Sequence, residues 1–151
     1  MVEIIVATSE DAGRIVDLFE AYRDFYQQKA DRAGALAFLE QRLQEGSSTI
    51  LLALEKSREG DEAVGFAQLY PTYTSLSLKA LWILSDLFVV PEGRRHGTGR
   101  LLLERARRLA EETQAEGLML QTAQDNYWAQ SVYESLGWER ENVFLTYNLF
   151  V

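Results

Sequence analysis

The segment 84–99, LSDLFVVPEGRRHGTG, constrains the fold of this chain more than any other stretch. Residues 84–90 are apolar and rich in β-branched and aromatic side chains, which predicts a buried strand. The strand is expected to end at Pro91, because proline lacks the N–H that a central strand needs. A turn with three glycines and three basic residues follows, and the helical pattern RLLLERARRLA begins directly after Gly99. The sequence therefore predicts a strand, a glycine-rich basic turn and a helix, in that order.

This turn has the features of an anion-binding site. Glycines let a backbone approach a ligand closely, and the N–H groups of a helix's first turn point towards that ligand at the positive end of the helix dipole. We interpret the turn as a candidate cradle for a pyrophosphate. It is not a P-loop, which needs G-x-x-x-x-G-K-[ST], and the G-x-G-x-x-G spacing of a dinucleotide-binding turn is absent. From the pattern alone, an ordinary strand-to-helix turn with glycines at positive φ explains these residues equally well.

Composition excludes several classes of protein. The 151 residues are 47% hydrophobic and 25% charged, which fits a single soluble domain over residues 1–151. The chain has no cysteine and one histidine, His96, so a disulfide framework, a thiolate nucleophile or a multi-histidine metal site is not available, and we expect no metal. A net charge of −8 disfavours nucleic acid as a partner and gives weak support to a cationic substrate. No apolar run approaches the ~20 residues of a membrane span, so we expect a cytoplasmic protein without a membrane partner.

Outside this segment, strand and helix patterns alternate along the chain. We expect strands at residues 2–7, 48–55, 63–70, 81–90 and 118–122, with closing strands from Trp138 and over residues 143–151. Amphipathic or capped segments predict four helices. The first follows a cap at Thr8 or Ser9 and runs to about residue 26, the second runs from Asp31 to Gly46, and the others cover residues 98–113 and 127–136. Residues 71–79 are expected to interrupt the sheet as a loop. This order predicts an α/β (α+β) fold: a mixed, mostly antiparallel sheet of six to seven strands, with helices on both faces and a parallel pair formed by residues 84–90 and 118–122.

Two motifs resemble those of the GNAT superfamily of acyl-CoA-dependent N-acetyltransferases. Arg94-x-x-Gly97-x-Gly99 resembles the family signature [QR]-x-x-G-x-[GA]. The run from Asn126 to Trp138 resembles the second family motif, N-x-x-A-x-x-[LV]-Y-x-x-x-G-[FW], and the order of elements matches over nearly the whole chain. The resemblance implies a GNAT-like fold whose parallel central pair splays apart. It also implies acetyl-CoA as the cosubstrate and direct attack by an amine within a ternary complex.

The resemblance also implies roles for individual residues. Tyr133 matches the tyrosine whose phenol protonates the leaving sulfur, and Asp86 is the candidate acceptor for the proton of the amine, directly or through water, ahead of Glu92. From the residues alone, Tyr133 could instead belong to a core stripe, Asp86 could be an ion-pair or turn-binding carboxylate, and Asn126 could be only a helix cap. The residues implied in cofactor binding are Phe88, Val89, Val90, Arg94, Arg95, His96, Gly97, Thr98, Gly99 and Asn126.

Finer resemblances suggest a substrate without fixing it. The GFA run at residues 65–67, Tyr70 and residues 84–89 resemble the diamine (spermidine/spermine) acetyltransferases, and residues 144–149 resemble a histone and polyamine acetyltransferase-like subgroup. Those diamine enzymes carry Glu-Asp where this chain has Ser85-Asp86. The leading hypothesis is a homodimeric N-acetyltransferase that acts on a small cationic amine. The alternatives are an acetyltransferase for lysine or N-terminal amines of proteins and peptides, and a non-catalytic acyl-CoA-binding module, which the presence of Tyr133 disfavours.

Overall fold

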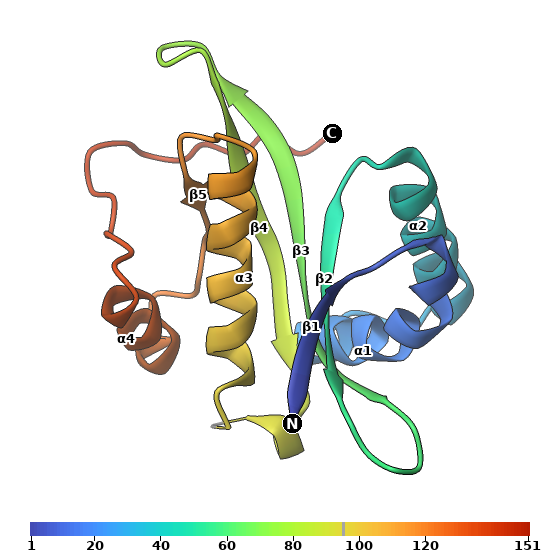
Figure 1. Cartoon of the computed structure of the whole chain (residues 1–151). Coiled ribbons are helices and arrows are strands. Elements are labelled where there is room, and N and C mark those ends of the chain that lie inside the picture. Colours follow the sequence, from blue (N-terminus) through green and yellow to red (C-terminus); the bar gives the residue numbers. More distant parts are fainter. Residues whose placement is uncertain (95) are drawn as a thin grey trace. The chain divides into compact units, whose positions relative to one another are not determined.

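Two units make up the chain, Met1–Leu120 and Gln121–Val151, in a computed structural model that describes residues 1–94 and 96–151. The first unit contains a sheet with helices on both of its sides, and the second contains a single helix among its described residues (Figure 1). We describe each unit separately below.

The first unit is organised around a sheet whose described strands number five and follow the order of the chain. The strands are β1 (Val2–Val6), β2 (Thr49–Glu55), β3 (Glu62–Thr74), β4 (Lys79–Val89) and β5 (Leu118–Met119). Strands β1 to β4 pair antiparallel, and β5 pairs parallel to β4 through Trp82 with Leu118 and Ile83 with Met119. The predicted parallel pair is therefore confirmed, although β5 lies at the edge of the described sheet and not at its centre.

Helices cover both faces of this sheet, as expected. Helices α1 (Ala12–Phe25) and α2 (Arg32–Glu45) lie on one side, and α3 (Thr98–Glu112) lies on the other (Figure 1). The α1 side is filled by a cluster in which Phe19 of α1 and Leu39 of α2 meet Phe66 of β3, with Phe88 of β4 at its margin. Burial of such side chains is the main favourable contribution to the folding of this unit.

The ends of the helices are set by local signals that the sequence shows. Asp31 caps α2 by accepting a hydrogen bond from the Gly34 amide at 3.0 Å, and Gly46 ends the helix in a left-handed conformation with φ of +64°. Pro91–Gly93 forms a short 3-10 turn after β4, and Gly97 with φ of +83° precedes α3. In the second unit, Asn126 caps α4 (Tyr127–Ser135).

The number of strands corrects the sequence prediction of six to seven. Residues 138–151 form no strand, although their alternating apolar side chains are typical of one. A strand requires a neighbour for its backbone groups, and the second unit has no other described strand to supply one. The strand expected over residues 118–122 is also shorter than predicted and ends at Met119.

A second correction concerns the loop expected over residues 71–79. Strand β3 continues through Pro71 as far as Thr74, and β4 already begins at Lys79, so only a four-residue turn separates the two strands. The pairing of β3 with β2 ends at Leu69, so beyond that residue one side of β3 is a sheet edge, where proline is tolerated. The sequence prediction is wrong here because it takes proline to interrupt a strand, whereas an edge position accommodates it.

Candidate functional site

The glycine-rich turn presents an open backbone surface at the start of α3. A Cβ atom added to Gly97 or to Gly99 would meet no described atom within 4 Å beyond the adjoining backbone, so a small group has room beside both residues. The φ of +83° at Gly97 is one that other residues rarely adopt, whereas Thr98 is buried and anchors the helix beneath the turn. Backbone groups at this helix N-terminus can therefore be approached closely by an anionic group.

The basic side chains of the turn have different environments. The Nε of Arg94 donates a hydrogen bond to the Val89 carbonyl at 2.8 Å. The Arg94 guanidinium lies 5.5 Å from the centre of the Phe88 ring and 5.8 Å from that of Phe25, so it is held against the end of β4 and α1. His96 is exposed. Arg95, which the sequence also assigns to cofactor binding, lies outside the described residues.

The backbone at the end of β4 is divided between two sides. The Val90 amide donates to the Val64 carbonyl at 2.9 Å, so Val90 and Phe88 face β3 in the antiparallel ladder. The N–H and C=O of Val89 consequently face the opposite side of β4, on which β5 pairs with Trp82 and Ile83 alone among the described residues. Of the three residues 88–90 that the sequence singles out, Val89 is therefore the one whose main chain faces away from the antiparallel sheet.

Asp86 is held by a chain of side-chain hydrogen bonds. The Ser48 hydroxyl donates to Gln68 Oε1 at 2.8 Å, and Gln68 Nε2 donates to Asp86 Oδ2 at 2.7 Å. Gln68 is fully buried, Ser48 is nearly so, and Asp86 is half-buried. The register pairs Gln68 with Asp86 and Leu69 with Leu84, which leaves Ser85 as the extra residue of a β-bulge directly before Asp86.

Two tyrosines contribute further to the environment of Asp86. Burial raises the pKa of the Tyr22 phenol, and the charge of Asp86 and a hydrogen bond to that carboxylate raise it further. Burial and the Asp86 charge also raise the pKa of Tyr70, while the charge of Arg42 partly offsets that rise. Both phenols therefore keep their protons at neutral pH and can donate hydrogen bonds.

Tyr22 also connects Asp86 to the hydrophobic core. Its ring centre lies 5.8 Å from that of Phe66 and 6.2 Å from that of Phe88, in edge-to-face contacts. The sequence favours core packing for Tyr22, with a wall of the substrate site as the alternative, and it gives no sign that Gln68 binds Asp86, because nothing in the local sequence of Gln68 indicates its partner. A half-buried carboxylate among phenols and an amide can accept a proton or bind a cation.

The second unit contains the other two residues of interest, Asn126 and Tyr133. The side chain of Asn126 accepts a hydrogen bond from the Ala129 amide at 3.3 Å, which confirms its role as the cap of α4. The half-buried Tyr133 ring lies 5.9 Å from that of Trp138, and the Trp138 amide donates to the Tyr133 carbonyl at 3.1 Å. No residue of α4 is fully buried in the described structure, so the exposed side of the helix is large.

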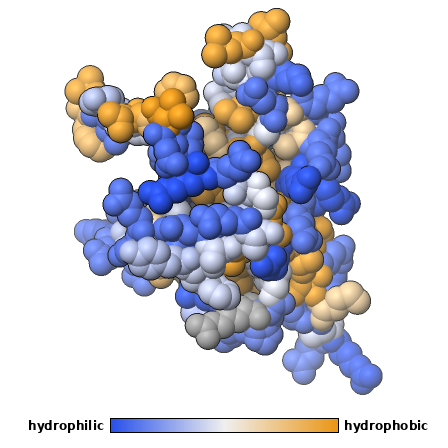
Figure 2. All heavy atoms as spheres, turned by 90° about the vertical axis from the view of Figure 1, so that its left-hand side faces the viewer, coloured by the Kyte–Doolittle hydropathy of each residue, from blue (hydrophilic) through white to orange (hydrophobic). Residues whose placement is uncertain are grey.

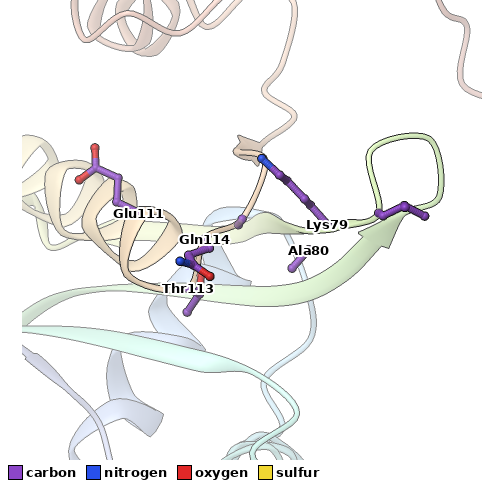
Figure 3. A pocket seen from close by; sticks show the side chains of 7 residues that line it. Lys79, Ala80, Glu111, Thr113 and Gln114 are labelled. Carbon is purple, nitrogen blue, oxygen red and sulfur yellow. The ribbon is translucent and has the colours of Figure 1, made fainter.

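A separate hollow lies at the opposite end of α3. It has a volume of about 620 Å³ and is formed where the start of β4 meets the end of that helix (Figure 3). Since α3 has 15 residues, this hollow is about 20 Å from the turn at Gly97, and none of the predicted site residues lines it. Its lining residues are Leu78, Lys79, Ala80, Glu111, Thr113, Gln114 and Ala115.

Metal sites and membrane spans are both absent from the part of the chain that the structure describes. They contain no group of three or more histidine, aspartate or glutamate side chains placed to hold a metal ion. None of the described helices is long and apolar enough to cross a lipid bilayer.

Comparison with known proteins gives matches over almost the whole chain. The model of the Acetyltransferase (GNAT) family matches residues 15–138. The uncharacterized N-acetyltransferase YhfO of Bacillus subtilis is 46% identical over 145 residues, which cover 96% of this chain and 95% of that protein. The crystal structure of a probable acetyltransferase, 41% identical, has a TM-score of 0.92 and covers 99% of this chain and 97% of its own. An aminoglycoside N-acetyltransferase, AAC(6')-Iy, solved with CoA, has a TM-score of 0.78 at 18% identity over 99% of this chain and 95% of its own, which shows the same fold.

Proposed function

The chain belongs to the GNAT family of acetyltransferases, and we propose that it transfers the acetyl group of acetyl-CoA to the primary amine of a small cationic acceptor. The family assignment supports the acyltransferase chemistry. The observation that supports an amine acceptor is the half-buried Asp86, held by Gln68 and facing two protonated phenols. Such a carboxylate favours a positively charged group.

The family uses acetyl-CoA, and the residues of the turn fit the phosphates of this cosubstrate. The space in front of Gly97 and Gly99 is open, and the first turn of α3 has no acidic residue that would repel an anion. We assign the backbone of residues 96–99 to the pyrophosphate. We assign the outward-facing main chain of Val89 to the pantetheine arm and to polarisation of the thioester carbonyl.

The proposed reaction needs a neutral amine and a protonated leaving group. The ammonium loses a proton to Asp86, directly or through water, and the freed nitrogen attacks the thioester carbonyl carbon. The C–N bond forms, the C–S bond breaks with its electron pair remaining on sulfur, and the nitrogen loses its second proton to solvent water as the neutral amide forms. We assign Tyr133 as the acid that donates its phenolic proton to the departing thiolate, since it matches the tyrosine of the family motif.

The acceptor is proposed to carry fewer positive charges than a polyamine. Ser85 stands where the diamine enzymes have glutamate, and its side chain is exposed on the β-bulge, so it adds no negative charge beside Asp86. One carboxylate at this position fits one ammonium group.

A thiol-release assay tests this proposal with acetyl-CoA and a panel of polyamines, amino acids, aminoglycosides, a lysine peptide and a peptide with a free N-terminal amine. We expect turnover with at least one small amine, and Asp86→Asn should lower kcat far more than it weakens acetyl-CoA binding. The deficit should shrink at alkaline pH, where free amine is abundant. Transfer to a peptide alone would favour a protein acetyltransferase. Acetyl-CoA binding without transfer to any amine would favour a binding module.

We also propose that the protein is a homodimer, with apolar residues near its C-terminus as the basis. Several large apolar side chains of residues 143–151 are exposed. On the face of the molecule drawn in Figure 2, groups of hydrophobic residues lie among hydrophilic ones. Large exposed apolar groups of this kind often mark an interface. Sedimentation equilibrium would measure the mass, and a monomer at all concentrations would contradict the proposal. The residues concerned are Val143, Phe144, Leu145, Tyr147, Leu149, Phe150 and Val151.

A further inference from the structure

The end of α2 carries an arginine whose hydrogen-bonding capacity is only partly used. The Arg42 side chain is only 20% exposed, and its Nε is buried without a hydrogen-bond partner among the described residues. Its Nη2 lies 3.4 Å from Glu45 Oε2, at the outer limit of a hydrogen bond, and its guanidinium lies 5.0 Å from the Phe38 ring centre. Buried polar groups normally have partners, so an unpaired buried N–H of a charged group needs an explanation.

A second buried donor without a partner among the described residues belongs to Ser47, five residues further along the chain. The hydroxyl of Ser47 is also buried without a partner in the described structure, and the Ser47 amide donates to the Arg42 carbonyl at 3.2 Å. The two residues are thus joined at the point where α2 ends and the chain turns into β2. Together they offer an N–H and an O–H, which are the donors that a carboxylate accepts.

Hydrogen bonds connect this corner to Asp86. Ser48, the next residue along the chain, donates to Gln68, and Gln68 donates to Asp86. Tyr70 lies within the electrostatic influence of both ends, because its phenol responds to the charge of Asp86 and to that of Arg42. The corner where α2 meets β2 therefore supplies a positive side chain, and the hydrogen bonds that run from Ser48 through Gln68 end at a negative one.

We infer that the acceptor of this acetyltransferase carries a carboxylate in addition to its amine, as an amino acid does. Arg42 and Ser47 bind the carboxylate, and Asp86 receives the ammonium group. The inference rests on the proposed function, since it places the acceptor amine at Asp86. A polyamine would bring a second positive charge towards Arg42 and is disfavoured by repulsion.

Paired acceptors that differ only in the carboxylate provide the test. Thiol release and acetylated product would be measured for free L-amino acids and for the corresponding carboxamides, which keep the amine and lose the negative charge. We expect the amino acids to have the higher kcat/KM. Arg42→Met, which keeps the length of the side chain over Phe38, should lower kcat/KM for the amino acid by about 10- to 150-fold and leave the carboxamide within about threefold.

Arg32→Met is the matched control. Arg32 lies on the same helix, but its side chain is 60% exposed and its ion pair with Asp17 is at the surface. Arg32→Met changes the net charge by the same amount as Arg42→Met and should leave kcat/KM unchanged for both acceptors.

A binding measurement separates this inference from the proposed function. In a calorimeter, the protein saturated with CoA would be titrated with the same amino acid and carboxamide. This measures the contribution of the carboxylate to binding even when no acetyl group is transferred. Preferential binding of the amino acid that is lost in Arg42→Met supports the inference, whatever the turnover. Equal binding or turnover of the two ligands, an equal loss for both in Arg42→Met, or turnover of polyamines alone would overturn it, while turnover of any small amine would still uphold the proposed function.

Discussion

The hydrogen bond from Gln68 to Asp86 gives a quantitative prediction, because Gln68→Glu changes one donor into an acceptor at nearly constant shape. The variant would place two carboxylates at the 2.7 Å separation that the amide and Asp86 now have. If both were ionised, their repulsion would be about 6 kcal/mol at an effective dielectric constant of ~20. Because Asp86 is partly exposed, we halve this repulsion to about 3 kcal/mol, which raises the pKa of the carboxylate pair by about two units.

The sign of the pH dependence follows from this raised pKa. The pair in Gln68→Glu shares a proton in the folded state, and its folded pKa lies above the unfolded glutamate value of ~4.3. Below the unfolded value the variant has no electrostatic penalty, and it loses stability as the pH rises through the folded pKa. Relative to wild type, the free energy of unfolding should fall by about 2 kcal/mol more at pH 8 than at pH 4.5.

Urea denaturation at the two pH values measures this difference. Gln44→Glu is the control, since Gln44 is exposed on α2 and the same change there should give no such dependence. A pH-independent loss in Gln68→Glu would show that the amide is only a packing residue and that Asp86 does not interact with position 68. In the enzyme assay, the same shared proton should move the acidic limb of the kcat profile towards alkaline pH.

Three further perturbations test other parts of the structure. Gly97→Val should lower the free energy of unfolding by about 1–2 kcal/mol, because the φ of +83° at this position is left-handed. Calorimetry should show much weaker acetyl-CoA binding in this variant and normal binding in the control Gly13→Val on α1. Unchanged affinity in a folded Gly97→Val protein would place the cofactor elsewhere. Tyr133→Phe should lower kcat by about 10²- to 10⁴-fold and leave the acetyl-CoA affinity within a few fold of wild type. The control Tyr147→Phe, at an exposed tyrosine, should leave kcat unchanged. A wild-type kcat in Tyr133→Phe would remove the general-acid assignment. Burial would raise the pKa of Asp11, but its hydrogen bonds and the Arg14 guanidinium hold this pKa below its ordinary value. The stability that the Asp11 carboxylate contributes is therefore present above pH ~4 and is lost on further acidification. The melting temperature of Asp11→Asn should fall less on acidification than that of wild type.

Local features of the fold could be predicted because their signals are contiguous in the sequence. Asp31 and Gly46 bracket α2 as expected, and the end of β4 at Val89 followed by Gly97 reproduces the predicted strand, turn and helix. These positions depend on caps, proline and positive φ, each of which is determined by one or two residues.

The surroundings of Asp86 could not be predicted in the same way. Gln68 lies in β3 and Ser48 directly before β2, so their convergence on Asp86 depends on the register of β2, β3 and β4. A buried glutamine in an apolar strand was the only available signal, and it does not identify its partner. The edge position of Pro71 also depends on where β2 stops pairing, which no local pattern indicates.

The bulge at Ser85 has a consequence for how β4 serves both layers of the first unit. Leu84 and Phe88 are four residues apart and would share a face in a regular strand, yet they pair with Leu69 and Phe66, which lie on opposite faces of β3. Phe88 joins the core beneath α1, while Trp82, on the far side of the bulge, donates its indole N–H to Thr113 at the end of α3 at 2.9 Å. Ser85 thus reverses which face of the sheet the preceding side chains of β4 occupy. Its deletion would turn Trp82 and its neighbours from the α3 side to the α1 side, in addition to shortening the hairpin.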